Sequence, residues 1–82
     1  MEFYVYVLRS TNFDRNYVGF TTNINRRLKQ HNSGKTTSTK PYIPWRILFY
    51  ETFFTKEEAL KREKFLKSGV GRSYIKDNYL AS

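Results

Sequence analysis

The chain has 82 residues, enough for one small domain with one modest core and one site. It has no cysteine and a single histidine, which excludes disulfides, a thiol nucleophile, thiolate zinc sites and a multi-histidine metal site, so any metal must use oxygen ligands. Fifteen Lys and Arg against seven Asp and Glu give a net charge of +8, which favours a nucleic acid as partner over a membrane surface. No apolar run approaches the roughly 18 residues that span a bilayer and no signal peptide opens the chain, so we expect a cytoplasmic protein.

The first twenty residues predict two strands joined as an antiparallel hairpin. Alternation divides residues 2–8 between two faces, with Phe3, Val5 and Val7 on one and Tyr4, Tyr6 and Leu8 on the other. A polar, turn-rich stretch at 10–16 follows, and residues 16–20 form a second short strand.

A helix is expected next, followed by a long polar loop and a third strand. Thr21, Thr22 and Asn23 are candidate caps for a helix that runs to about residue 32, and Gly34 suits its C-terminal cap. Residues 33–44 form the loop, and the aromatic and β-branched residues 45–54 form the strand.

The last third of the chain predicts two helices. Thr55 and Glu58 form a capping box for a helix that continues through Leu66 and ends before Gly69. Gly71 breaks the chain again, and residues 73–80 form a final short helix. The expected fold is therefore α+β, a three-stranded antiparallel sheet flanked by helices in the order β-β-α-β-α-α, forming a single domain over residues 1–82.

Two charged or titratable side chains share the inner stripe of the first helix. Arg27 and His31 lie on the same face as Ile24 and Leu28 by their spacing. Either they belong to a functional site, or Arg27 extends to solvent from the edge of the stripe and His31 sits near a helix C-terminus that favours its charged form.

Glu63 is the least expected residue of the second helix. Ala59, Leu60 and Leu66 define the inner face of this helix, and Glu63 falls between them. A carboxylate in an apolar stripe is costly unless it is paired or holds a metal, so we expect a divalent cation or an ion pair with Arg27.

Three tyrosines lie on the predicted hairpin. Tyr4 and Tyr6 share one face of the first strand, and Tyr17 begins the second. Tyrosine in strands is usually a packing residue, but it can accept a proton where a nearby cation lowers its pKa.

These residues together resemble the GIY-YIG nuclease domain. The segment Tyr4-Val5-Tyr6 and the segment Tyr17-Val18-Gly19 match its two short motifs, and Arg27, His31 and Glu63 follow in order. The resemblance covers nearly the whole chain and is strongest to small stand-alone proteins similar to the N-terminal nuclease domain of the bacterial excision-repair endonuclease.

The resemblance implies a catalytic set and a metal. Tyr6, Tyr17, Arg27, His31 and Glu63 would be catalytic, with Glu63 the ligand of one Mg²⁺ or Mn²⁺ ion and Arg27 the contact to the scissile phosphate. Three further positions follow from the same motifs with less support: Tyr4, which replaces the first motif glycine, Gly19, and Asn78. We expect a Mg²⁺-dependent DNA endonuclease, structure-selective or non-specific, acting in repair or recombination.

Three alternatives stay open from the sequence. The chain could keep the nuclease fold yet only dock nucleic acid or a partner, and its substrate could be RNA rather than DNA. A protein partner could also supply the substrate specificity, because no separate DNA-binding domain is present in these 82 residues.

Overall fold

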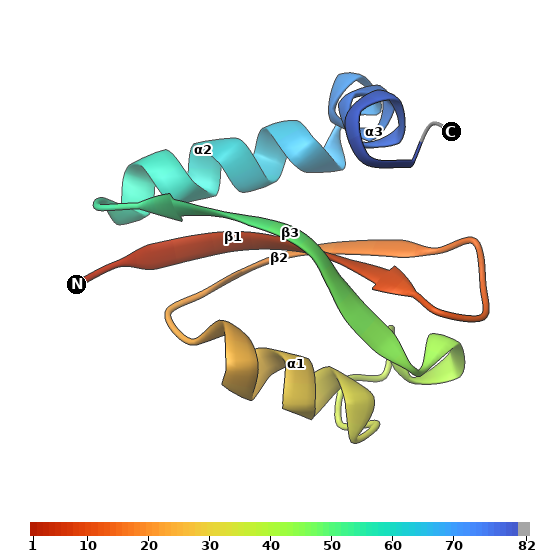
Figure 1. The fold of residues 1–82 in the computed structure, drawn as a ribbon. Coiled ribbons are helices and arrows are strands. Elements are labelled where there is room, and N and C mark those ends of the chain that lie inside the picture. The colour runs from red at the N-terminus through yellow and green to blue at the C-terminus, as the bar shows by residue number, and fades with distance from the viewer. Residues whose placement is uncertain (81–82) are drawn as a thin grey trace.

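The computed structural model describes residues 1–80 and contains a three-stranded antiparallel sheet with helices on both faces (Figure 1). The strands are β1 (Phe3–Ser10), β2 (Asn16–Thr21) and β3 (Trp45–Phe53). The helices are α1 (Ile24–Asn32), α2 (Lys56–Lys67) and α3 (Gly69–Ile75), with a 3₁₀ turn η1 (Lys40–Tyr42) and a π-helical segment η2 (Lys76–Leu80). The predicted fold class and element order are confirmed.

The sheet has the order β2-β1-β3, so β1 is central and pairs antiparallel with both neighbours. In Figure 1, α1 covers one face and α2 with α3 covers the other. Val5 and Val7 face α2 and α3, whereas Tyr6 and Leu8 face α1, as the alternation predicted. This alternation gives the molecule one core on each side of the sheet.

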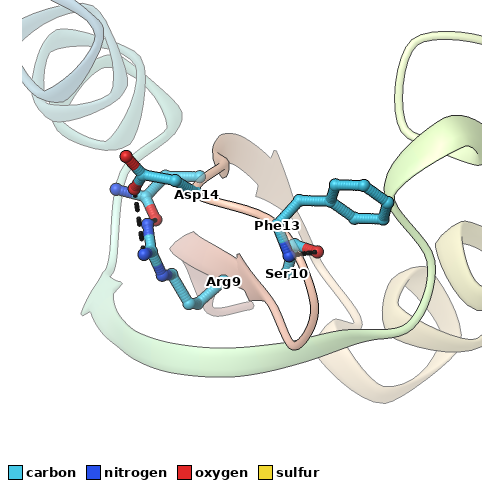
Figure 2. Close-up of polar contacts among 5 residues, drawn as sticks. Arg9, Ser10, Phe13 and Asp14 are labelled. Carbon is cyan, nitrogen blue, oxygen red and sulfur yellow. Dashed lines mark hydrogen bonds and ion pairs between the residues drawn. The ribbon is translucent and has the colours of Figure 1, made fainter.

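The loop between β1 and β2 is held by side chains of its own ends (Figure 2). Arg9 forms an ion pair with Asp14, with 3.0 Å between Nη2 and Oδ1, and Ser10 Oγ accepts from the Phe13 N–H at 3.2 Å. The Ser10 hydroxyl also donates to the Tyr42 carbonyl at 2.7 Å, which ties the hairpin to η1.

The caps of α1 follow the sequence. Asn23 is the N-cap, and its side-chain oxygen accepts from the Arg26 N–H at 3.1 Å. Gly34 has a φ of 81°, in the left-handed region that glycine adopts without steric cost, and ends the helix.

The predicted N-cap of α2 at Thr55 is confirmed, and Glu58 reaches back to the Thr55 hydroxyl rather than to its backbone N–H. Thr55 Oγ1 accepts from the Glu58 N–H at 3.3 Å and donates to the Glu58 carboxylate at 2.9 Å. The prediction for Leu60 was wrong: it is 42% exposed, whereas Ala59 and Leu66 are fully buried. A single helix lying on a sheet buries a narrow stripe, and Leu60 lies about 100° around the helix from Ala59.

The predicted break at Gly71 was also wrong, because α3 begins at Gly69 and runs through it. Ser68 caps α3 by accepting from the Gly71 N–H at 3.1 Å. A methyl group at Gly71 would overlap the Phe65 carbonyl and the Leu66 backbone, so glycine is required here for α3 to pack closely on α2. The helix predicted at 73–80 is thus the second half of a longer helical segment.

Within residues 1–80, no helix has both the length and the apolar character needed to cross a bilayer.

Candidate functional site

The space beside Gly19 of β2 determines where the Tyr6 side chain lies. Tyr6 of β1 is paired with Gly19 of β2, and a methyl group at Gly19 would overlap the Tyr6 ring and hydroxyl. The absence of a side chain at Gly19 therefore lets the Tyr6 ring lie over β2. This is the physical reason for glycine at the end of the Tyr17-Val18-Gly19 motif.

The Tyr6 hydroxyl is the centre of a polar cluster under α1. It lies 3.1 Å from His31 Nε2, and it accepts a long hydrogen bond of 3.5 Å from Arg27 Nε. Arg27 Nη1 also donates to the Gln30 side chain at 3.0 Å, so two bonds fix the plane of the guanidinium. Arg27 and His31 thus share one face of α1, as their spacing predicted, and the structure brings both to the Tyr6 hydroxyl.

His31 continues the cluster into a buried hydrogen-bond chain. His31 Nδ1 lies 2.9 Å from Thr39 Oγ1, and the Thr39 hydroxyl lies 3.3 Å from the Thr36 carbonyl, which can only accept. Thr39 therefore accepts from His31 Nδ1–H, and His31 Nε2 accepts from Tyr6. Trp45 Nε1 donates to the Thr39 carbonyl at 2.9 Å and holds the loop in place.

Burial determines the protonation states of His31 and Tyr6. The pKa of His31 is lowered by burial and then by the Arg27 charge, so the imidazole is neutral at neutral pH. The pKa of Tyr6 is raised, mainly by burial, although Arg27 opposes the shift, and Tyr17 and Glu63 add to it. The Tyr6 hydroxyl is therefore a hydrogen-bond donor to His31, not a phenolate.

Tyr17 lies beside this cluster but opens to the surface. Its ring packs against His31 with 4.7 Å between centroids, and it lies 6.3 Å from the Tyr6 ring. Unlike Tyr6 and His31, which are 1% and 0% exposed, Tyr17 is only partly buried and lines a surface pocket with Lys67. Tyr17 can therefore meet a ligand that Tyr6 and His31 cannot reach.

Glu63 approaches the cluster from α2. Its carboxylate forms an ion pair with Lys67, one turn later, with 3.1 Å between Oε2 and Nζ. The expected pairing with Arg27 was wrong, because Arg27 bonds to Tyr6 and Gln30 instead. Lys67 lines the same surface pocket as Tyr17, so the Glu63–Lys67 pair lies beside the Tyr17 end of the cluster although Glu63 comes from the opposite face of the sheet.

The residues around Glu63 fit a magnesium ion. Among the catalytic candidates only Glu63 carries a carboxylate, and residues 1–80 contain no group of three or more His, Asp or Glu side chains that could hold a metal. Mg²⁺ is commonly bound this way, with water and substrate phosphate oxygens completing its coordination. The Glu63 side chain is 20% exposed and its partner Lys67 is 53% exposed, so the ion pair can exchange for a cation without unfolding α2.

Two candidates lie outside the cluster. Tyr4 points to the α1 side, but its hydroxyl donates to Glu2 at 2.9 Å and its ring packs edge-on against Tyr50. Asn78 is exposed on η2, and its amide donates to the Tyr74 carbonyl at 2.8 Å, so its observed role is local.

Sequence reasoning missed several residues that build the site. Gln30 lies three residues after Arg27 and Lys67 four residues after Glu63, and both spacings are a detectable signal of side-chain contact on a helix. Thr39 carries no such signal, because it sits in a polar loop and is buried only by folding against Trp45 and His31.

Comparison with known proteins gives a consistent result. The family model described as the GIY-YIG catalytic domain matches residues 2–76. A UPF0213 protein of Streptococcus agalactiae serotype V is 35% identical over 79 residues, covering 92% of this chain and 89% of that protein. One of Streptococcus pyogenes serotype M5 is 38% identical over 71 residues, covering 85% and 76%. The solution NMR structure of a UPF0213 protein of Bacillus halodurans matches 94% of this chain and 84% of that one, at 34% identity and a TM-score of 0.57. The chain therefore belongs to the GIY-YIG family of nucleases.

Proposed function

We propose that this protein is a divalent-metal-dependent endonuclease that hydrolyses phosphodiester bonds in DNA. The observation that carries the proposal is the guanidinium of Arg27, held by Tyr6 and Gln30 and beside Tyr17. A planar, always-charged group held in this way suits the oxygens of a phosphate.

Exposure divides the cluster into two roles. Tyr17, Arg27 and Glu63 are partly exposed and can touch a substrate. Tyr6 and His31 are closed off and act as positioning residues, because Tyr6 orients Arg27 and His31 orients Tyr6. All five catalytic candidates from the sequence stay in this proposal, but only Tyr17, Arg27 and Glu63 would contact the phosphate.

Hydrolysis needs a proton acceptor for the attacking water and positive charge at the phosphate. Tyr17 carries the exposed hydroxyl of the cluster and lies beside the Arg27 cation, so we assign it as the proton acceptor. Arg27 would donate to the non-bridging phosphate oxygens as negative charge develops on them. Glu63 would hold one Mg²⁺ or Mn²⁺ ion, which when bound supplies further charge at the phosphate and the leaving oxygen.

The net charge of +8 supports a polyanionic substrate, and we propose DNA as that substrate. The residues named for the reaction would contact a phosphate, and none is assigned to a base edge, so the activity would depend on DNA structure or be non-specific. This suits a role in repair or recombination in the cytoplasm, with a protein partner supplying further selectivity.

The test is a nicking assay on plain, nicked, flapped and branched DNA and on matched RNA, each with Mg²⁺, Mn²⁺ or a chelator. We expect metal-dependent cleavage of one or more DNA forms, lost in Glu63→Gln and retained in Glu57→Gln, a matched exposed glutamate in the first turn of α2. DNA binding without cleavage under every condition would contradict the proposal and favour a docking module. Cleavage of RNA alone would show that the substrate is RNA rather than DNA.

A further inference from the structure

Two neighbouring pockets lie beside β2 at the edge of the sheet, and the first of them includes Tyr17 of the candidate site. The first, of about 270 Å³, is lined by Tyr17, Lys67 and Arg72, and the second, of about 520 Å³, by Arg15 and Lys76 among others. Both are also lined by Asn16 and Arg72, so they form one depression between β2 and the α2–α3 corner. We call it the β2-edge groove and define it by these residues: Asn16, Tyr17, Lys67, Arg72, Arg15 and Lys76.

The groove is strongly basic. Four of the six residues that define it are cationic, and none is acidic. Asp14, which also lines the second pocket, is paired with Arg9 at the hairpin (Figure 2), and Lys67 is paired with Glu63. Within residues 1–80, no ion pair to a carboxylate involves Arg15, Arg72 or Lys76. Arg72 and Lys76 are exposed and follow each other by one helical turn.

The groove starts at the candidate site and leads away from it. Tyr17 lines its inner end, where Lys67 is also the ion-pair partner of Glu63. Its outer end lies at the β1–β2 loop and η2, and Figure 1 shows the hairpin loop and α3 at the same end of the molecule. β2 is an edge strand, so its outer side adds main-chain N–H groups to the cationic side chains.

We propose that the β2-edge groove binds the sugar–phosphate backbone of DNA on one side of the cleaved phosphate. This inference rests on the proposed function. A strand held at Tyr17 and Arg27 must continue over the surface, and the groove is the basic path that begins there. Arg72 and Lys76 would each neutralise a phosphate, and the strand would therefore enter the site in one direction past α3.

A second basic surface provides the control. The outer side of α1 bears a pocket of about 650 Å³ lined by Arg26, Lys29 and Lys35, with no carboxylate in its lining. It shares no lining residue with the pocket that contains Tyr17. If exposed charge alone decided binding, removing two cations from either surface would weaken binding to the same extent.

The experiment compares two double variants, Arg72→Ala with Lys76→Ala in the groove and Arg26→Ala with Lys29→Ala on α1. Each removes two exposed helical cations. Binding of a fluorescent DNA duplex and of a branched DNA is measured by anisotropy over a range of salt concentrations. We expect the groove pair to weaken binding about tenfold or more and to reduce the slope of log affinity against log salt by about 2. The α1 pair should leave the slope nearly unchanged.

A crosslinking measurement covers the case in which a double variant folds poorly. The chain has no cysteine, so one introduced thiol carries a photocrosslinker at a unique position. Asn16→Cys places it in the groove and Ser33→Cys places it in the α1 pocket. Crosslinks to DNA should form from position 16 and not from position 33.

Equal losses in the two double variants, or crosslinking from position 33 alone, would overturn the groove and leave the proposed function standing. Binding of an acidic peptide, but not DNA, through Arg72 and Lys76 would also overturn it. Absence of any DNA binding by the unsubstituted protein would overturn the groove and the proposed function together.

Discussion

The face of the sheet under α2 and α3 and the face under α1 are formed by alternate residues of the same central strand. On the first, Val5 and Val7 pack with Leu66 and Ile75 in an apolar core. On the second, Tyr6 lies among His31, Arg27 and Thr39 and is held by hydrogen bonds. One face thus owes its stability mainly to apolar burial, and the other depends on matched polar groups, which are costly when a partner is lost.

The comparison teaches where chemistry can be placed in so small a protein. Because the α2–α3 face supplies a closed core, the α1 face can contain partly exposed polar groups without unfolding the chain. Glu63 comes from the first face, and its partner Lys67 lines one pocket with Tyr17, so the candidate residues of the two faces meet beside β2.

The largest expected effect concerns Arg27. We expect Arg27→Ala to lower nicking by two to three orders of magnitude, about 3–4 kcal/mol of transition-state stabilisation, with little change in DNA affinity, since fourteen other cations remain. The control is Arg26→Ala, an exposed neighbour on α1 whose side chain lies outside the cluster. A parallel loss of binding and cleavage in Arg27→Ala would place Arg27 in the general basic surface instead.

Leu66→Ala removes side-chain contacts from the apolar core under α2 and α3. Leu66 is fully buried, and its truncation should lower the free energy of unfolding by about 2–5 kcal/mol, measured by denaturant titration. Leu60→Ala, on the same helix but 42% exposed, should cost less than about 1 kcal/mol. Similar losses for the two leucines would mean that α2 rests on the sheet through a different stripe.

Gly19→Ala should displace the polar cluster under α1 without replacing any of its polar residues. The added methyl overlaps Tyr6, so either the ring or β2 must move, at an expected cost of about 1–3 kcal/mol together with a loss of nicking. Gly69→Ala is the matched control, because a methyl there meets no atom within 4 Å and alanine favours the helix. An unchanged nicking rate in Gly19→Ala would show that the position of Tyr6 does not matter for Arg27.

The pH dependence of stability tests the neutral state of His31. Its pKa in the folded state is below 6.5, so the unfolded chain binds the proton more readily. The contribution of His31 is therefore present above about pH 6.5 and is lost as the pH falls through the folded pKa. We expect thermal stability to decrease from pH 7 to pH 5 and to decrease less in His31→Gln. Identical profiles for the two proteins would contradict a buried neutral imidazole.

How far the sequence could predict this molecule depends on the range of the interactions. Period-two alternation in β1, the N-cap at Thr55 and the glycine at Gly34 are local, and they correctly predicted the two faces, the start of α2 and the end of α1. Thr39 and the Arg62–Glu51 ion pair, which joins α2 to β3, depend on segments that meet only in the fold. The two errors in the helices arose because packing outweighed local propensity: the sheet leaves Leu60 exposed, and the contact with α2 keeps Gly71 inside a helix.

The smallest expected effect on stability comes from a comparison of two glutamates, Glu51 and Glu63. Glu51 accepts two hydrogen bonds from Arg62, at 2.7 and 3.1 Å, and Arg62 lies over the rings of Phe65 and Tyr74. Glu63 instead forms a single contact with a lysine that is 53% exposed, a pair of a kind worth about 0.3–0.5 kcal/mol. Glu51→Gln should thus lower the free energy of unfolding by on the order of 1–2 kcal/mol, because one charge-assisted pair of bonds is lost.

Glu63→Gln should change the free energy of unfolding by no more than a few tenths of a kcal/mol, since its pair with Lys67 contributes so little. Denaturant titrations of both variants, with nicking measured on the same preparations, would make the comparison. If Glu63 serves a cation, its variant keeps its stability and loses cleavage, while Glu51→Gln loses stability and keeps the activity of the folded fraction. A Glu63→Gln protein as unstable as Glu51→Gln would instead show that Glu63 has a structural role in α2.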